Sequence, residues 1–290
     1  MTREQILKLR KDFDHYVDAF AVAGDGIHPL LQLKAKHSRR VADEARMLSA
    51  DLGWSASERN VAEALGLLHD IGRFSQFLKY HTFADSASVD HGEYGWTVTG
   101  RTAWLSGLTI KEREAILNGI RYHNRRAIPE EISPQSLPFL RLIRDADKLD
   151  IFRVVLEAVE RDGFRDLLQM LPGVVLDRSV SPQVIKEIED HRRCSLSNVR
   201  SLGDFLLMQL SWVYNLNYIP TFWRVSDRDI ILRIMRHFEG VSRIQKLEAK
   251  ARQFVAERLS VGLSRRKQYL AKQVKTRRWY SDHKREISAN

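Results

Sequence analysis

The chain has 290 residues, of which 43% are hydrophobic and 29% are charged. This composition is typical of a globular protein with a sizeable core, and it excludes a largely disordered chain. The only cysteine is Cys194, which excludes an intrachain disulfide and a cysteine-based zinc site, so any bound metal must be held by nitrogen and oxygen.

No apolar run approaches the roughly 20 residues that a membrane-spanning helix needs, and the first residues lack the hydrophobic core of a secretory signal. We therefore expect a cytoplasmic protein without a membrane partner. The formal net charge of +10 is unevenly distributed along the chain. Residues 241–290 contain 14 Lys or Arg and 4 Asp or Glu, whereas residues 1–240 contain 33 of each sign.

Apolar residues recur at helical spacing almost throughout, and no segment alternates as a strand would, so the sequence predicts an all-α fold. Ser55 with Glu58, and Thr109 with Glu112, have the spacing of capping boxes at helix starts. Residues 79–90 are small and polar and predict a loop beside His69. In chain order, the expected helices cover residues 3–22, 29–52, 57–71, 91–106, 110–124, 138–161, 182–192, 197–217, 227–239 and 242–273.

These elements group into three expected parts of the chain. Residues 1–162 form one compact helical domain, residues 163–241 form a helical extension packed on it, and residues 242–290 form a basic C-terminal helix and tail.

Histidines and aspartates occur on, or at the ends of, five of the expected helices. A single inward-facing histidine is more often a satisfied core residue than a ligand, but a set of this size is costly to bury unless its members meet one another or a cation. The joint pattern therefore predicts a metal site. Its candidate members are His37, His69, Asp70, His91, His123 and an aspartate between residues 145 and 150.

The order of these residues resembles the HD superfamily of metal-dependent phosphohydrolases. The segment from Leu67 to Phe74 is similar to the central motif of the family, and residues 90–95, 120–124 and 144–150 resemble its third-histidine, fourth-histidine and closing-helix segments. The resemblance covers about residues 30–155. It implies an all-α, multi-helix HD-type bundle with a metal site in its core, to which this chain adds further C-terminal helices.

The resemblance also implies roles for individual residues. A first metal would be held by His37, His69, Asp70 and Asp147, and a second by His91 and His123, with Asp70 bridging the two. Asp147 is preferred to Asp145 because it matches the family pattern, and Asp145 and Asp150 are interpreted as surface or supporting carboxylates. Mixed imidazole and carboxylate ligands suit one or two ions of Mn, Fe, Co, Ni or Zn, with Mg as a further option.

Such a site fits the hydrolysis of a phosphate ester by a metal-activated water. The expected substrate is a small phosphorylated molecule such as a nucleotide, and whether it is a monoester or a diester is left open, as is the oligomeric state. Arg73, three residues after Asp70, is the first choice for a phosphate contact. Asp70, Arg73 and Lys148 are the expected catalytic residues, and Arg73, Arg125 and His81 the expected substrate contacts.

Two other functions are compatible with the same residues. The first is a regulatory HD module that binds a nucleotide without turnover. The second is a nuclease or nucleic-acid-binding protein, because residues 264–280 interleave cations with aromatic residues that could contact phosphates and stack on bases.

Overall fold

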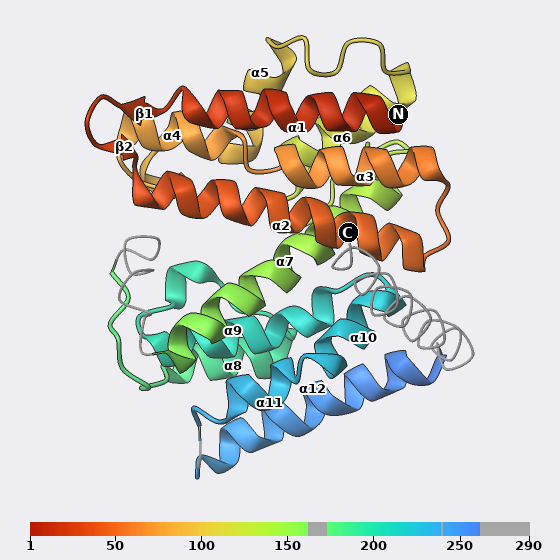
Figure 1. The fold of residues 1–290 in the computed structure, drawn as a ribbon. Coiled ribbons are helices and arrows are strands. Elements are labelled where there is room, and N and C mark those ends of the chain that lie inside the picture. The colour runs from red at the N-terminus through yellow and green to blue at the C-terminus, as the bar shows by residue number, and fades with distance from the viewer. Residues whose placement is uncertain (162–172, 239, 262–290) are drawn as a thin grey trace, which may run out of the picture.

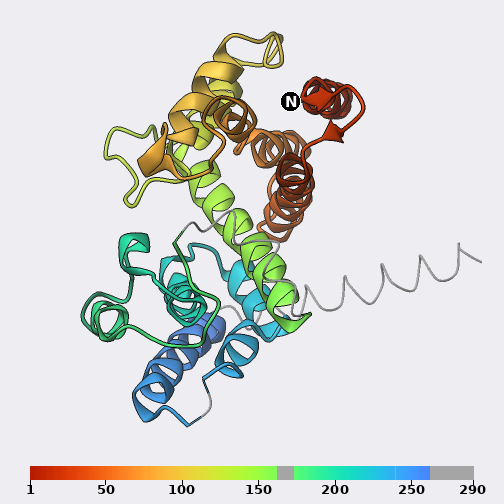
Figure 2. The same ribbon diagram turned by 90° about the vertical axis from the view of Figure 1, so that its left-hand side faces the viewer.

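The computed structural model describes residues 1–161, 173–238 and 240–261, and it confirms the all-α fold class. Figure 1 shows two groups of helices, and Figure 2 shows α7 running from the first group into the second. The first group contains α1 (Arg3–Asp18), α2 (Pro29–Asp51), α3 (Ala56–Leu68), α4 (Gly72–Tyr80), α5 (His91–Gly100), α6 (Ile110–Tyr122) and the first part of α7 (Leu137–Glu160).

The first group is built around α3, whose nine residues from Asn60 to Leu68 are all buried. The second helix, α2, packs along both α3 and α7, while α1 and α6 also pack on α3. Capping boxes begin α3 at Ser55 and α6 at Thr109, as the sequence predicts. These contacts bring α2, α3, α6 and α7 around a common centre.

The second group packs against the end of α7. It contains α8 (Pro182–His191), α9 (Leu202–Ser211), α10 (Ile219–Asp227), α11 (Ile230–Met235) and α12 (Ser242–Val261), with 3-10 turns η3 (Leu196–Asn198) and η4 (Trp212–Asn215). Buried apolar residues of both groups belong to one continuous core. Within the described ranges, no helix has both the length and the apolar character that crossing a bilayer requires.

Buried polar contacts attach α10 to two helices of the first group. The carboxylate of Asp145 on α7 accepts hydrogen bonds from the backbone of Asn217 and Tyr218 and from the Thr221 hydroxyl, which satisfies donors at the start of α10. Farther along α10, Arg224 forms an ion pair with Glu44 of α2. Thus α10 contacts both α2 and α7.

Several predicted helix boundaries are wrong. The first helix ends at Asp18, and residues 21–22 instead form β1 (Ala21–Val22), which pairs with β2 (Gly26–Ile27). Gly24 in the turn between them adopts a positive φ angle that favours glycine. The predicted helix 57–71 ends at residue 68, and α4, which follows, was not predicted.

The other errors lie at later helix ends. The predicted helix 91–106 ends at Gly100, and 197–217 is divided into η3, α9 and η4 because the Ser201 side chain caps α9. Of the predicted helix 227–239, the structure forms α11 at residues 230–235. The preceding helix α10 was not predicted, and a left-handed backbone conformation at Asp229 separates the two. The end of the predicted helix 242–273 lies outside the described residues, as does the basic segment 264–280.

Candidate metal centre

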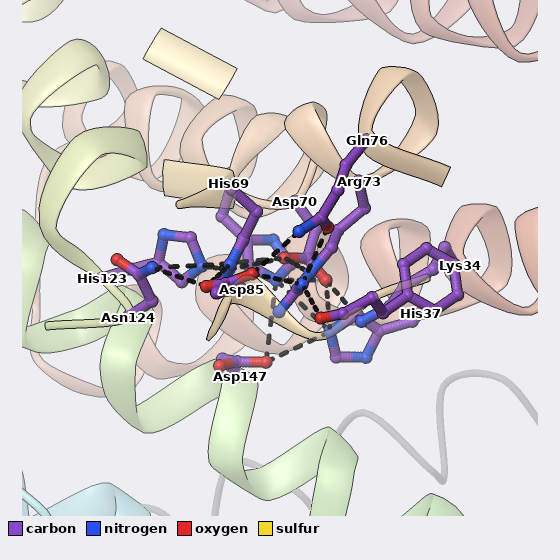
Figure 3. A network of polar contacts seen from close by, with 12 residues as sticks. Lys34, His37, His69, Asp70, Arg73, Gln76, Asp85, His123, Asn124 and Asp147 are labelled. Carbon is purple, nitrogen blue, oxygen red and sulfur yellow. Dashed lines mark hydrogen bonds and ion pairs between the residues drawn. The ribbon is translucent and has the colours of Figure 1, made fainter. Parts of the chain in front are cut away.

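His69 and Asp70 lie where α3 ends and α4 begins. The Ile71 N–H donates to the Leu68 carbonyl (3.0 Å), and the Arg73 N–H donates to the Asp70 carbonyl (2.9 Å), so the backbone turns tightly between the two helices. His69 is fully buried and Asp70 is only 3% exposed. The turn therefore directs an imidazole and a carboxylate into the core (Figure 3).

Glycines allow the neighbouring segments to approach this turn. A Cβ atom at Gly72 would lie 2.3 Å from the His91 carbonyl oxygen, and one at Gly92 would lie 2.7 Å from the Arg121 carbonyl oxygen. Side chains at these two positions would push α4 from α5 and α5 from α6. The glycines thus bring His91, at the start of α5, and His123, at the end of α6, close to Asp70.

Three predicted ligands meet on one side of Asp70. The Nε2 atoms of His37 and His69 are 3.2 Å apart, and they lie 3.7 and 3.8 Å from Oδ2 of Asp70. Oδ1 of Asp147, from α7, lies 3.1 Å from the His37 Nε2 and 3.6 Å from the His69 Nε2. We call His37, His69, Asp147 and Oδ2 of Asp70 the first half of the His–Asp cluster.

Two more histidines meet on the other side of the same carboxylate. The Nε2 atoms of His91 and His123 are 3.1 Å apart, and they lie 3.3 and 3.7 Å from Oδ1 of Asp70. These two histidines with Oδ1 form the second half of the cluster. Asp70 thus offers one oxygen to each half, and the buried triads His37–His69–Asp70 and Asp70–His91–His123 each have the spacing of a group that could hold a metal ion.

The outward-facing nitrogen of every histidine in the cluster is hydrogen-bonded to an acceptor. Nδ1 of His69 donates to the Gly66 carbonyl and Nδ1 of His123 to the Ile120 carbonyl, both at 2.8 Å. A carbonyl oxygen can only accept, so these Nδ1 atoms carry the hydrogen. In the other two histidines Nδ1 contacts a carboxylate: Asp150 lies 2.7 Å from His37, and Asp85 lies 2.6 Å from His91.

This hydrogen bonding fits a divalent cation. With Nδ1 protonated, each neutral imidazole presents an Nε2 lone pair to the interior, and two facing lone pairs 3.1–3.2 Å apart repel each other unless a proton or a cation lies between them. Outward hydrogen bonds to carboxylates and carbonyls are also the usual second contact of metal-binding histidines. The nitrogen and oxygen donors suit a transition metal.

Charges around the cluster shift its pKa values in the metal-free protein. Burial opposes ionisation, but the Lys34 ammonium and the neighbouring imidazoles hold the pKa of Asp70 well below its ordinary value. Burial also opposes protonation of His37, yet its hydrogen bonds with Asp147 and Asp150 raise the pKa to about 9. For His91, burial and the nearby Arg73 charge lower the pKa to about 4, although Asp85 opposes them.

Comparison with known proteins yielded one match. The family model described as HD domain matches residues 35–151. This match covers 117 of the 290 residues. No curated protein and no solved structure matched the chain. A match to this model indicates similarity to the superfamily of metal-dependent phosphohydrolases, whose HD domains bind divalent metals, and the matched residues include every residue of the His–Asp cluster.

Two basic residues, Lys34 and Arg73, flank Asp70. The Lys34 ammonium, one helical turn before His37 on α2, donates to Oδ2 of Asp70 at 2.8 Å. The Arg73 guanidinium lies on the other side, with Nε 3.7 Å from Oδ1 of Asp70 and Nη1 donating to Asp85 at 2.8 Å. Sequence reasoning found Arg73 but missed Lys34, although its position three residues before His37 places both on one helix face.

Of the predicted loop 79–90, residues 79 and 80 belong to the end of α4, and residues 81–90 form a loop beside the cluster that contains a short 3-10 turn, η1 (Asp85–Ala87). The side chain of Gln76 on α4 is fully buried and donates to Asp85, Ser88 and the Val89 carbonyl, which attaches the loop to α4. Asp85 in turn contacts His91. The supporting role of Gln76 was missed, because it depends on a loop conformation that helical periodicity does not reveal.

The hydrogen bonds and ion pairs that Lys148 and Arg125 form in the described structure are with residues outside the cluster. Lys148 follows Asp147 on α7, and its ammonium donates to the Arg144 carbonyl at 3.1 Å. Arg125 forms ion pairs with Asp90 and Glu93. His81 is exposed and ends α4 in a left-handed conformation.

Two carboxylates of α7 outside the ligand set have different surroundings. Asp150 is buried and supports His37, and it also accepts hydrogen bonds from Arg40 and Arg153. Asp145 is fully buried and binds the start of α10 instead. Neither is a surface residue.

Proposed function

We propose that this protein is a divalent-metal-dependent phosphohydrolase that cleaves the ester bond of a small phosphorylated substrate, such as a nucleotide, with a metal-activated water. The observation that carries the proposal is the convergence of four Nε2 atoms on the two oxygens of Asp70, with all four Nδ1 atoms hydrogen-bonded outward. A binding surface without chemistry has no need for this arrangement.

The residues of each half would hold one ion. His37, His69, Asp70 and Asp147 would bind the first, and Asp70, His91 and His123 the second. When bound, divalent cations supply Lewis acidity, polarising phosphoryl oxygens and acidifying water. The protein contributes a dry, buried site and, through Asp150 and Asp85, a fixed orientation of His37 and His91.

Lys34 and Arg73 are suited to bind the phosphate. The Lys34 ammonium has three donors, and among the described residues Asp70 is its hydrogen-bond partner, so two donors are left for phosphate oxygens. Nε of Arg73 is buried without a hydrogen-bond partner in the described structure. A buried, unpaired donor is costly, and a phosphate oxygen would satisfy it.

Contacts from Lys148, Arg125 and His81 to the substrate stay predictions. Burial and the nearby Arg144 charge lower the pKa of Lys148 to about 8, so that its ammonium remains largely protonated at neutral pH. Nucleic-acid binding by residues 264–280, which lie outside the described residues, also stays a prediction.

The test is metal reconstitution followed by phosphoester assays. Metal-stripped protein is loaded separately with Mn, Fe, Co, Ni, Zn and Mg ions, its metal content is measured by mass spectrometry, and turnover is followed on nitrophenyl phosphate monoesters, diesters and a nucleotide panel. We expect up to two ions per chain and metal-dependent hydrolysis. Failure to bind any metal would refute the proposal, and metal and nucleotide binding without turnover would favour the regulatory module.

A pair of lysine variants tests the phosphate contact. Lys34→Gln should lower kcat/KM by about tenfold to a hundredfold, because a charge-assisted contact to phosphate is lost. Lys36→Gln is the matched control, since Lys36 is on the same helix but exposed. Equal activity in the two variants would rule out a phosphate contact by Lys34.

A further inference from the structure

A hollow lined largely by arginines lies between α7 and the α10–α11 turn. Its lining residues are Arg153, Glu157, Arg228, Ile230 and Arg233, and its volume is about 340 Å³. That volume is within the range of small-molecule sites. We call it the arginine groove. It contains none of the residues of the His–Asp cluster.

Each arginine of the groove is anchored by a carboxylate on one side. Arg153 binds Oδ1 of Asp150 through Nε (3.3 Å) and Nη2 (2.8 Å). Arg233 binds Glu160 through the same two nitrogens at 2.7 and 2.8 Å. The third, Arg228, binds Glu44 through Nη2 at 2.6 Å.

The other side of each guanidinium is unused. Among the described residues, Nη1 of Arg153, Arg228 and Arg233 has no hydrogen-bond partner, and these side chains are only 36%, 31% and 21% exposed. Guanidinium groups that are already oriented lose less conformational entropy when they bind an anion. The groove therefore presents three preorganised cationic donors to a common space.

From this arrangement, we propose that the arginine groove is a second anion site, separate from the His–Asp cluster, that binds the phosphate group of a small molecule. Planar guanidinium donors match the geometry of phosphate oxygens. Glu157 is the one carboxylate side chain that lines the groove, and it pairs with Arg161 at 3.2 Å. The three arginines each pair with a carboxylate outside the lining, and the Nη1 donors that these pairs leave unused are what an anionic ligand would bind.

A short chain of contacts connects this groove to the cluster. Arg153 binds Asp150, and Asp150 contacts Nδ1 of His37. An anion held by Arg153 would thus lie two side chains away from His37, but it would not share a ligand with either half of the cluster.

Calorimetric titration with inorganic pyrophosphate tests the proposal. The titration uses the full chain carrying Asp70→Ala in metal-free buffer, so that the cluster holds no metal to which pyrophosphate could bind. Metal-free wild-type protein is titrated in parallel, because Asp70→Ala could fold poorly. We expect binding in both. Arg228→Gln and Arg233→Gln should each weaken it by roughly five- to tenfold, because each removes a charged donor from a partly exposed site.

Two further variants make the test specific. Glu157→Gln should tighten pyrophosphate binding, because it removes the negative charge from the groove lining. Arg243→Gln is the matched control: Arg243 makes the same two-nitrogen contact with Glu189, at 3.1 and 2.6 Å, but outside the groove. The affinity of Arg243→Gln for pyrophosphate should equal that of the protein without this substitution.

Three results would overturn the proposal. The first is that pyrophosphate does not bind the metal-free protein. The second is that Arg228→Gln and Arg233→Gln both bind it with unchanged affinity. The third is that Arg243→Gln lowers the affinity for pyrophosphate as much as Arg233→Gln does. Undiminished binding in the groove variants would place the anion elsewhere, for example on the basic residues 264–280. Circular dichroism melts of each variant establish that it is folded at the titration temperature.

Discussion

The two halves of the His–Asp cluster share Asp70 but are supported by different kinds of structure. In the first half, His37 is supported by Asp150, which lies on the long helix α7 and is only 4% exposed. Arg40 and Arg153 also donate hydrogen bonds to the Asp150 carboxylate. In the second half, the residue that supports His91 is Asp85, whose side chain is 32% exposed in a short 3-10 turn. One half is built from long helices, and the other depends on a loop.

The halves also differ in charge. Asp147 and Asp150 both contact His37, in addition to Asp70 nearby. In the second half, Asp85 is the additional carboxylate. Arginines offset both supporting carboxylates, Asp150 and Asp85, so the difference lies in Asp147, which has no counterpart among the described contacts of the second half. Because a cation is attracted by negative charge that water does not screen, we expect the first half to bind its ion more tightly.

The largest effect is expected from the residue that the halves share. Asp70→Ala should abolish binding of both ions and reduce hydrolysis to the background rate, because it removes an oxygen from each half. Metal content per chain and turnover measure this loss. Retention of one tightly bound ion by this variant would contradict the bridging role of Asp70.

Variants of single halves sharpen the same prediction. Asp147→Ala should remove the tighter binding event, and His123→Ala the weaker one, each leaving about one ion per chain. Titration of metal-free protein with a competing chelator distinguishes the two events. If His123→Ala eliminates the tighter event, the assignment of affinities to the halves is reversed.

A smaller effect is expected from the supporting carboxylates. Asp150→Asn and Asp85→Asn should each lower the metal affinity of their own half by about 10- to 100-fold, because the ligating imidazole loses its orienting partner. Asp150→Asn should in addition destabilise the metal-free fold by about 3 kcal/mol, since it leaves Arg40 and Arg153 without their buried partner. For Asp85, which is more exposed, the loss should be smaller.

Chelator titration and urea unfolding of metal-free protein measure these two quantities separately. The prediction fails if Asp85→Asn weakens only the tighter binding event, or if it destabilises the fold as much as Asp150→Asn does. Asp43→Asn is a suitable control, because Asp43 forms an exposed ion pair with Arg10 away from the cluster.

The ligands of this cluster were predictable because residue type and order along the chain carry the signal. His37, His69, Asp70, His91, His123 and Asp147 were all named from the sequence, and the structure brings all six together. Their ligation of metal ions stays a prediction. The supporting residues carry no comparable signal: Asp85 and Gln76 act through a loop whose conformation depends on tertiary contacts.

Helix boundaries show the same limit in the fold. The capping boxes at Ser55 and Thr109 were recognisable because their hydrogen bonds are local. The start of α4 at Gly72 was not, because glycine there serves a close contact with α5 rather than ending a helix. Similarly, Asp145 could not be assigned to α10, which lies more than 70 residues farther along the chain.

The smallest expected effect is a difference in pH dependence between the halves in metal-free protein. An ordinary histidine has a pKa near 6.5. Burial opposes protonation of His37, but its hydrogen bonds with Asp147 and Asp150 raise its pKa to about 9. Burial and the nearby Arg73 charge lower the pKa of His91 to about 4. A raised pKa stabilises the folded state fully below about pH 6.5, and this contribution disappears as the pH rises through 9.

The sign is opposite for His91. Its lowered pKa costs stability as the pH falls from 6.5 toward 4, because the unfolded chain takes up a proton that the folded site does not. Melting temperatures of metal-free protein should therefore decline on both sides, with His37→Asn flattening the alkaline decline and His91→Asn flattening the acid one. The melting temperature of His37→Asn could instead decline at alkaline pH as steeply as that of the wild type. This result would show that the carboxylates of the first half do not hold a proton on His37, and it would contradict the proposed charge difference between the halves.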